Sequence, residues 1–191
     1  MKVAFFSLFF IAGASAFSTL PSFSKSSSAL KAVVKEFEVG SKKVTVFDGD
    51  YSDAIVNLVT ETAKAAIEAK GSFSLAIPGG SVVKALGGLD NESFDMTKMH
   101  VYFCNERIGA NKCYSGAMEA FAEKCGVPVE NVHQVPEGEP TAVAAEYAET
   151  MKNDASLDQS GPIPACDLML LGTGDVSQQL SILDFPLSQN K

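Results

Sequence analysis

The chain is poor in the residues on which many catalytic and metal sites depend. Its 191 residues include one arginine, two histidines and four cysteines, and no tryptophan. The cysteines form no Cys-x-x-Cys pair and have no histidine at metal-ligand spacing, so we expect free thiols and no metal site. No stretch reaches the roughly 20 apolar residues that a membrane span requires, which argues against an integral membrane protein.

Acidic residues are absent from the first 35 positions and abundant afterwards. All 23 lie from Glu36 onward, whereas 12 of the 15 basic residues follow residue 32, so this part carries a formal charge of −11. Such a charge repels nucleic acid and anionic membranes. We therefore expect no nucleic-acid or membrane partner, and an anionic ligand would need a local pocket.

The first 32 residues have the composition of a targeting segment. Residues 1–16 combine a basic start, an apolar run and a small-x-small cleavage site, which predicts a signal peptide. Residues 17–32 are rich in serine and have no acid, as in transit peptides. The junction at Phe17 resembles the bipartite presequence of algae with secondary plastids. We expect a plastid protein, with secretion through a Ser-rich linker as the alternative.

The remaining sequence predicts one α/β domain that begins at residue 33. Strands alternate with helices, which favours a Rossmann-like open, mostly parallel sheet with helices on both faces. The predicted strands are 44–47, 73–77, 99–104 and 166–171, and the predicted helices are 51–70, 81–86, 113–125 and 141–153.

A glycine turn follows the second predicted strand. Gly79 and Gly80 let backbone N–H groups point at an anion, and Ser81 adds a hydroxyl at the start of a helix. The turn is neither a Walker loop nor a Gly-x-Gly-x-x-Gly motif. A tight strand–helix connection with a capping serine explains the same residues.

The sole arginine lies where the next strand ends. Arg107 can grip a phosphate with two hydrogen bonds, and Glu106 can orient it or contact a sugar hydroxyl. A solvated charge pair on a surface loop is the alternative. His100 and His133 do not follow strand ends, so we expect structural roles for both.

Four segments together resemble the 6-phosphogluconolactonase family, within the glucosamine-6-phosphate isomerase/deaminase superfamily. Residues 75–81 are similar to its Gly-Gly-Ser phosphate loop, and 101–107 to its strand ending in Asp-Glu-Arg. Residues 128–133 resemble its Pro-x-x-Asn-Val-His stretch. Residues 167–174 resemble its Asp-Leu-x-Leu-Leu-Gly-x-Gly strand.

The resemblance implies hydrolysis of 6-phospho-D-glucono-1,5-lactone to 6-phosphogluconate in the pentose phosphate pathway, without a metal or organic cofactor. It implies that Gly79, Gly80, Ser81 and Arg107 hold the phosphorylated lactone or a related sugar phosphate. Asn105, Glu106, Gly172 and Gly174 are the remaining expected binding residues. In the family, a histidine following the last glycine strand acts as the base.

The sequence departs from the family at two places. Asn105 replaces the usual Asp, and Val176, Ser177 and Gln178 stand where the family has Asp-Gly-His. Because an amide has no useful basicity, Gln178 cannot serve as the base, and we expect no catalytic residue and impaired activity. The resemblance thus implies a partial domain over residues 33–174, with a sheet that is incomplete at its carboxyl end, and a divergent tail at 175–191. Its abrupt loss after Gly174 is typical of a truncated or mispredicted gene end.

Three other interpretations stay open. The chain can be a sugar-phosphate binding protein without activity, or a truncated product that folds poorly. It can also be an isomerase or deaminase of the same superfamily, although that branch is expected to carry Asp-Glu-Tyr where this chain has Glu106 and Arg107.

Overall fold

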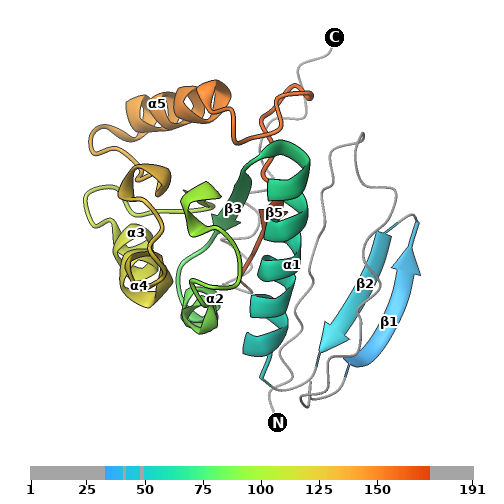
Figure 1. Cartoon of the computed structure of the whole chain (residues 1–191). Coiled ribbons are helices and arrows are strands. Elements are labelled where there is room, and N and C mark those ends of the chain that lie inside the picture. The colour runs from blue at the N-terminus through green and yellow to red at the C-terminus, as the bar shows by residue number, and fades with distance from the viewer. Residues whose placement is uncertain (1–32, 41, 48–49, 173–191) are drawn as a thin grey trace.

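A computed structural model describes residues 33–40, 42–47 and 50–172 of the chain (Figure 1). The predicted signal peptide at 1–16, the Ser-rich segment at 17–32 and the tail at 175–191 lie outside these residues. None of the helices in the described part is both long and apolar enough to cross a membrane.

The main sheet has three parallel strands in the order β4-β3-β5. The central strand β3 (Phe73–Ile77) pairs with β4 (Met99–Phe103) along its full length, and with β5 (Leu168–Met169) over two residues. Every residue of β3 is buried, as expected for a parallel strand covered on both faces. The predicted α/β class with an open parallel sheet is confirmed.

Alternate residues of the strands pack into two different hydrophobic cores. Phe73, Leu75 and Ile77 face a large apolar cluster that includes buried residues of the long helix α1 (Ser52–Lys70) and the short helix α2 (Ser81–Ala85). Ala76 and Tyr102 face the opposite side, where a smaller cluster includes residues of α5 (Pro140–Asn153). Because strand side chains alternate between faces, this division places helices on both sides of the sheet.

A third helical region lies between β4 and α5. It begins as α3 (Lys112–Ala117), passes through a π-helical turn at Met118–Ala122 and ends as α4 (Glu123–Cys125), where Gly126 adopts a left-handed conformation. The sequence predicts one regular helix over 113–125, which is correct in extent and wrong about the π turn. Such turns insert one extra residue into a helix, and residue periodicity alone does not reveal them.

The chain's first two strands form a separate antiparallel hairpin. β1 (Val33–Val39) pairs with β2 (Lys42–Phe47) and makes its own two-stranded sheet (Figure 1). The prediction of a strand at 44–47 found the second of these and missed the first. β1 alternates charged with apolar residues and directly follows a segment whose composition indicated a targeting sequence, which masked its strand pattern.

The last predicted strand is shorter than expected. The apolar run 166–171 predicts six residues of strand, but only Leu168 and Met169 form a ladder with β3. The ladder begins only after Asp167, whose carboxylate instead accepts hydrogen bonds from the backbone N–H and hydroxyl of Ser74, both at 2.8 Å. The predicted strand 99–104 likewise ends one residue early, at Phe103.

Candidate functional site

The glycine turn after β3 depends on both glycines, for different reasons. Gly80 has φ 85° and ψ −141°, a conformation that residues with a Cβ rarely adopt. Gly79 has an ordinary φ, but a Cβ there would lie 2.9 Å from Sγ of Cys113 on α3. The turn therefore brings the backbone of 79–80 close to α3, which is the geometry that a backbone anion site needs.

Ser81 does not cap α2 as predicted. Gly80 occupies the N-cap position, and Ser81 is the first residue of the helix. Its hydroxyl is exposed and accepts a hydrogen bond of 3.2 Å from the hydroxyl of Tyr51. The correction follows from Gly80, whose backbone conformation already turns the chain into the helix and leaves the serine oxygen available to other donors.

Glu106 is held by the backbone at the start of α3. One carboxylate oxygen accepts the N–H of Arg107 at 2.8 Å, and the other accepts those of Cys113 and Tyr114 at 2.8 and 2.9 Å. Burial opposes the charge of Glu106, but these hydrogen bonds outweigh it and lower the pKa of the carboxyl. Glu106 thus fixes the loop after β4 against α3, and its carboxylate is occupied in doing so.

Arg107 is exposed, and none of the ion pairs of the described residues includes it. Its carbonyl accepts the N–H of Ala110 at 2.9 Å and of Asn111 at 3.2 Å, so its backbone is fixed while its guanidinium projects from a tight loop. Glu106 contacts the Arg107 backbone. A charge pair between the two side chains, one reading of the sequence, is not observed.

The three segments that the sequence predicts to bind the ligand leave the sheet at the same edge. Ile77 is the register partner of Phe103, and the N–H of Cys104 donates to the carbonyl of Ile77 at 2.9 Å. On the other side of β3, the N–H of Leu170 donates to the carbonyl of Ala76, also at 2.9 Å. The chain therefore enters the segments 79–81, 105–107 and 171–172 from adjacent strands. Gly174 and Gln178 lie outside the described residues.

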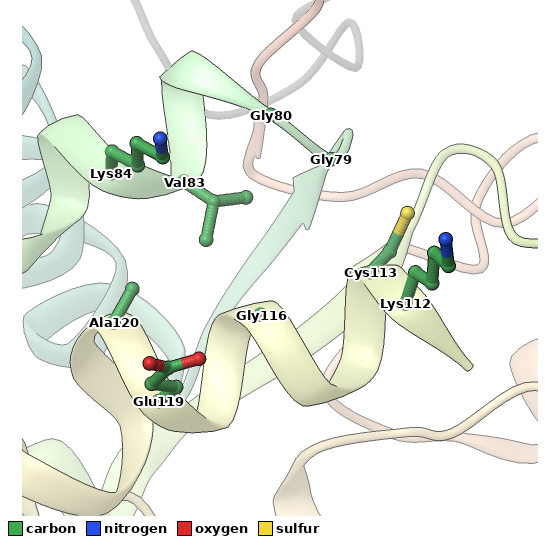
Figure 2. Close-up of a pocket in the computed structure, with 9 residues that line it drawn as sticks. All are labelled: Gly79, Gly80, Val83, Lys84, Lys112, Cys113, Gly116, Glu119 and Ala120. Carbon is green, nitrogen blue, oxygen red and sulfur yellow. The ribbon is translucent and has the colours of Figure 1, made fainter. Parts of the chain in front are cut away.

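A cavity of about 420 Å³ opens beside the glycine turn. Figure 2 shows α2 on one side of it and the α3 region on the other, with the side chain of Cys113 directed toward Gly79. It is lined by Gly79, Gly80, Val83, Lys84, Lys112, Cys113, Gly116, Glu119 and Ala120. Asn105, Glu106 and Arg107 are not among these residues, although Glu106 reaches the lining residue Cys113 through its hydrogen bond to the backbone N–H.

Lys84 and Lys112 are the basic residues among the pocket lining, and the sequence analysis predicted a binding role for neither. They come from opposite walls, α2 and α3, and their ammonium groups supply positive charge in an otherwise acidic domain. Their positions, three residues after Ser81 and five after Arg107, were the available signal. Two ammonium groups and the glycine N–H groups outnumber the one carboxylate of the lining, that of Glu119, so the pocket suits an anion such as a phosphate.

Cys113 is not an activated nucleophile, although it lines the pocket. Burial, together with the nearby carboxylate of Glu106, raises the pKa of the Cys113 thiol to about 11. The thiolate is the reactive form of cysteine, so this side chain is inert near neutral pH. Its place in the pocket is explained by packing against the glycine turn.

Both histidines lie away from this pocket. His100 is the second residue of β4, and His133 follows the 3₁₀ turn Val129–Asn131. Burial lowers the pKa of both imidazoles, while the carboxylate of Asp154 acts in the opposite direction. The prediction that neither belongs to the ligand edge agrees with these positions.

The comparison with known protein families identifies the family to which the chain belongs. Residues 48–177 match the family model described as glucosamine-6-phosphate isomerases/6-phosphogluconolactonase. The chain belongs to this family. The matched range of this family member includes the glycine turn, the Arg107 loop and the strand β5, which are the segments that meet at the sheet edge.

Individual relatives agree with this assignment. The 6-phosphogluconolactonase of Nostoc sp. is 29% identical over 136 residues, which cover 66% of this chain and 55% of that protein. A probable chloroplastic 6-phosphogluconolactonase 3 of Oryza sativa is 28% identical over 145 residues, 68% of this chain and 44% of that protein. The 6-phosphogluconolactonase of Synechocystis sp. is 30% identical over 139 residues, 68% of this chain and 56% of that protein. The chain spans about half the length of the curated relatives it matches.

Proposed function

We propose that this family member binds a phosphorylated sugar lactone, or a closely related sugar phosphate, at the carboxyl edge of its parallel sheet. The observation that carries the proposal is that three strand-end segments leave the sheet at one edge, with a cavity beside the first of them, the glycine turn. Ile77 and Phe103 are register partners, so the glycine turn and the Arg107 loop start side by side. Open α/β sheets bind their ligands at this edge.

The phosphate would be held by groups of three kinds. Backbone N–H groups of the 79–81 turn approach closely because both glycines permit it. The ammonium groups of Lys84 and Lys112 neutralise charge from the two walls of the cavity. The guanidinium of Arg107, free of ion pairs within the described part of the chain, can close over the ligand from the neighbouring loop.

The reaction supported by the relatives is hydrolysis of 6-phospho-D-glucono-1,5-lactone. Water attacks the lactone carbonyl, the ring C–O bond breaks, and the products are a carboxylate and a hydroxyl, as in 6-phosphogluconate. The attacking water must lose a proton to a base. By the family resemblance Gln178 stands at the position of that base, and its amide cannot accept a proton near neutral pH. We infer that this chain binds the sugar phosphate and hydrolyses the lactone slowly.

A restoration experiment tests both halves of this proposal. The purified 191-residue chain is compared with the triple variant Val176→Asp, Ser177→Gly, Gln178→His for lactone hydrolysis above the spontaneous rate. General-base catalysis typically contributes 10²- to 10⁴-fold, so we expect a gain of at least about 100-fold in the triple variant. The matched control Val176→Asp, Ser177→Gly keeps Gln178 and should gain nothing. Rapid turnover by the unmodified chain would contradict the proposed impairment.

A sugar-phosphate binding protein without enzymatic activity is the second candidate, and Gln178 favours it. The two candidates differ in the triple variant, because a site that has lost only its base regains activity, whereas a remodelled site binds and stays inactive. Competition by glucosamine-6-phosphate against 6-phosphogluconate distinguishes the isomerase/deaminase branch, which would prefer the amino sugar.

Plastid import is proposed for the leader, with secretion as the alternative. Residues 1–16 and 17–32 have the compositions of a signal peptide and a transit peptide, and the rice relative is described as chloroplastic. Fusion of residues 1–35 to a fluorescent protein, expressed in an alga with secondary plastids, tests this. Plastid fluorescence is expected, and export of the fusion would favour secretion.

A further inference from the structure

A cluster of three potential ligands lies on the sheet at a distance from the glycine turn. His100, His133 and Asp154 each present one donor atom, and the three atoms converge. Nδ1 of His100 is 3.2 Å from Nε2 of His133 and 3.9 Å from Oδ2 of Asp154. Nε2 of His133 is 3.2 Å from Oδ2 of Asp154. The proposed sugar-phosphate site uses none of these residues.

The fold brings these residues together from three separate segments. His100 lies in β4, and His133 is tied to the same strand because its N–H donates to the carbonyl of Val101 at 2.9 Å. Asp154 is the residue at which α5 ends. The 33 and 21 positions between them explain why a search for local ligand spacing in the sequence did not find the cluster.

The triangle of donor atoms has the size of a zinc site. A tetrahedral Zn²⁺ with bonds of about 2.0–2.1 Å to nitrogen and oxygen separates its ligand atoms by about 3.3 Å. The two separations of 3.2 Å match this spacing. The separation of 3.9 Å between His100 and Asp154 must shorten by about 0.6 Å, which a small rotation of one side chain allows, before an ion bound to all three atoms can be tetrahedral.

One proton cannot make both of the short contacts in the cluster into hydrogen bonds at the same time. Nε2 of His133 has two neighbours at 3.2 Å, Nδ1 of His100 and Oδ2 of Asp154, and a single N–H on that atom points along one of these contacts. The third separation, 3.9 Å, is too long for a hydrogen bond. A cation at the centre would instead accept a lone pair from all three atoms at once.

The surroundings hold the three side chains in place. The ring of Tyr102 stacks on that of His133, with centroids 4.3 Å apart and planes within 6°. The other oxygen of Asp154, Oδ1, accepts the N–H of Ser156 at 2.8 Å. Outer-shell contacts of this kind orient metal ligands and add to affinity. The nearby ammonium of Lys70 is paired with Asp167 at 3.0 Å and so is partly neutralised.

We propose that His100, His133 and Asp154 form a site for a divalent transition-metal ion, with Zn²⁺ as the best match, that ties the end of α5 to β4. Two imidazoles and one carboxylate favour Zn²⁺ over Mg²⁺ or Ca²⁺, which prefer oxygen ligands. The ligand side chains are 22%, 13% and 14% exposed, so a water molecule completes the coordination. The ion stabilises the fold and stands apart from the sugar-phosphate pocket.

Metal titration of the full chain tests the proposal. The chain is stripped with a chelator and dialysed, and Zn²⁺ is added while heat of binding and thermal unfolding are measured. We expect one Zn²⁺ per chain and a higher melting temperature. His100→Gln and Asp154→Asn should each weaken Zn²⁺ binding by at least about tenfold, a loss that removal of a mere outer-shell partner can already reach. Glu149→Gln, an exposed acid on α5, is the matched control and should change nothing.

The absorption spectrum of the chain with bound Co²⁺ tests the proposed metal site without any variant. Co²⁺ in this site should show the visible bands of low coordination without the thiolate charge-transfer band, because no cysteine belongs to the cluster. Absence of stoichiometric binding by the wild-type chain would overturn the proposal. So would a thiolate band, or Zn²⁺ binding that survives both ligand variants and disappears in Cys166→Ser. Binding of 6-phosphogluconate is a separate measurement, so failure of one proposal leaves the other standing.

Discussion

The contact between Gly79 and Cys113 makes a quantitative prediction about how the glycine turn is positioned. A Cβ at residue 79 would lie 2.9 Å from Sγ of Cys113, whereas ordinary van der Waals contacts begin at 3.4 Å. Gly79→Ala therefore forces the buried thiol of Cys113 into another rotamer, or the turn and α3 apart by about half an ångström. Overpacking of this kind costs about 1–3 kcal/mol.

The same contact predicts that a second substitution rescues the first. Cys113→Ala removes the sulfur that the new methyl group would meet, at a cost of about 1 kcal/mol for the lost buried thiol. The methyl group added at position 79 then occupies the space that Sγ has left. The double variant should thus be about as stable as Cys113→Ala alone, so the coupling energy equals the cost of Gly79→Ala, about 1–3 kcal/mol, within the range for residues in contact.

Urea unfolding of the four chains, followed by circular dichroism, measures this coupling. Gly116→Ala is a matched control, because Gly116 lines the same pocket and has no atom within 4 Å of its would-be Cβ. Additive losses from Gly79→Ala and Cys113→Ala would refute the reasoning, since they would show that the turn does not pack on α3 as described.

Three further predictions concern the elements around the site. Glu106→Gln should destabilise the chain by about 1–2 kcal/mol at pH 7, because the carboxylate accepts three backbone N–H groups. The lowered pKa of Glu106 stabilises the fold above the unfolded glutamate pKa of about 4.3, so the difference between the two chains should shrink as acid titration passes through the folded pKa. Gly80→Ala should cost about 1–3 kcal/mol in urea unfolding, because its φ of 85° strains any residue with a Cβ. Asp167→Ala should lower stability by about 2–3 kcal/mol in the same assay, because it leaves the buried N–H of Ser74 without its partner; a neutral effect would contradict the account of β5.

Much of the fold was predictable because its signals are local. The α1 helix ends where Gly71, with φ 81°, stops it, and the buried strand β3 follows as a continuous apolar run. The start of β5 was not predictable, because it depends on Asp167 reaching Ser74, a residue 93 positions away. The π turn at Met118–Ala122 likewise has no periodicity that a reader of the sequence can detect.

The sequence predicts at which edge of the sheet the candidate site lies, but not which residues line its cavity. The strand-end rule correctly places the turn at Gly79 and the loop at Arg107 next to each other. Whether these residues bind a ligand stays a prediction. The cavity walls depend on how α2 and α3 pack, so Lys84 and Lys112 emerge only in three dimensions. The His100 cluster depends on three segments that meet only after folding.

Calorimetric titration of the purified chain with 6-phosphogluconate tests the central claim most directly, with gluconate as the matched ligand that lacks the phosphate. The account predicts stoichiometric binding of 6-phosphogluconate and none of gluconate at the same concentrations. Arg107→Met, together with Lys84→Met, should abolish the heat of binding while the chain stays folded. Binding that is equal for both ligands, or unchanged in the double variant, would contradict a phosphate site at this edge of the sheet.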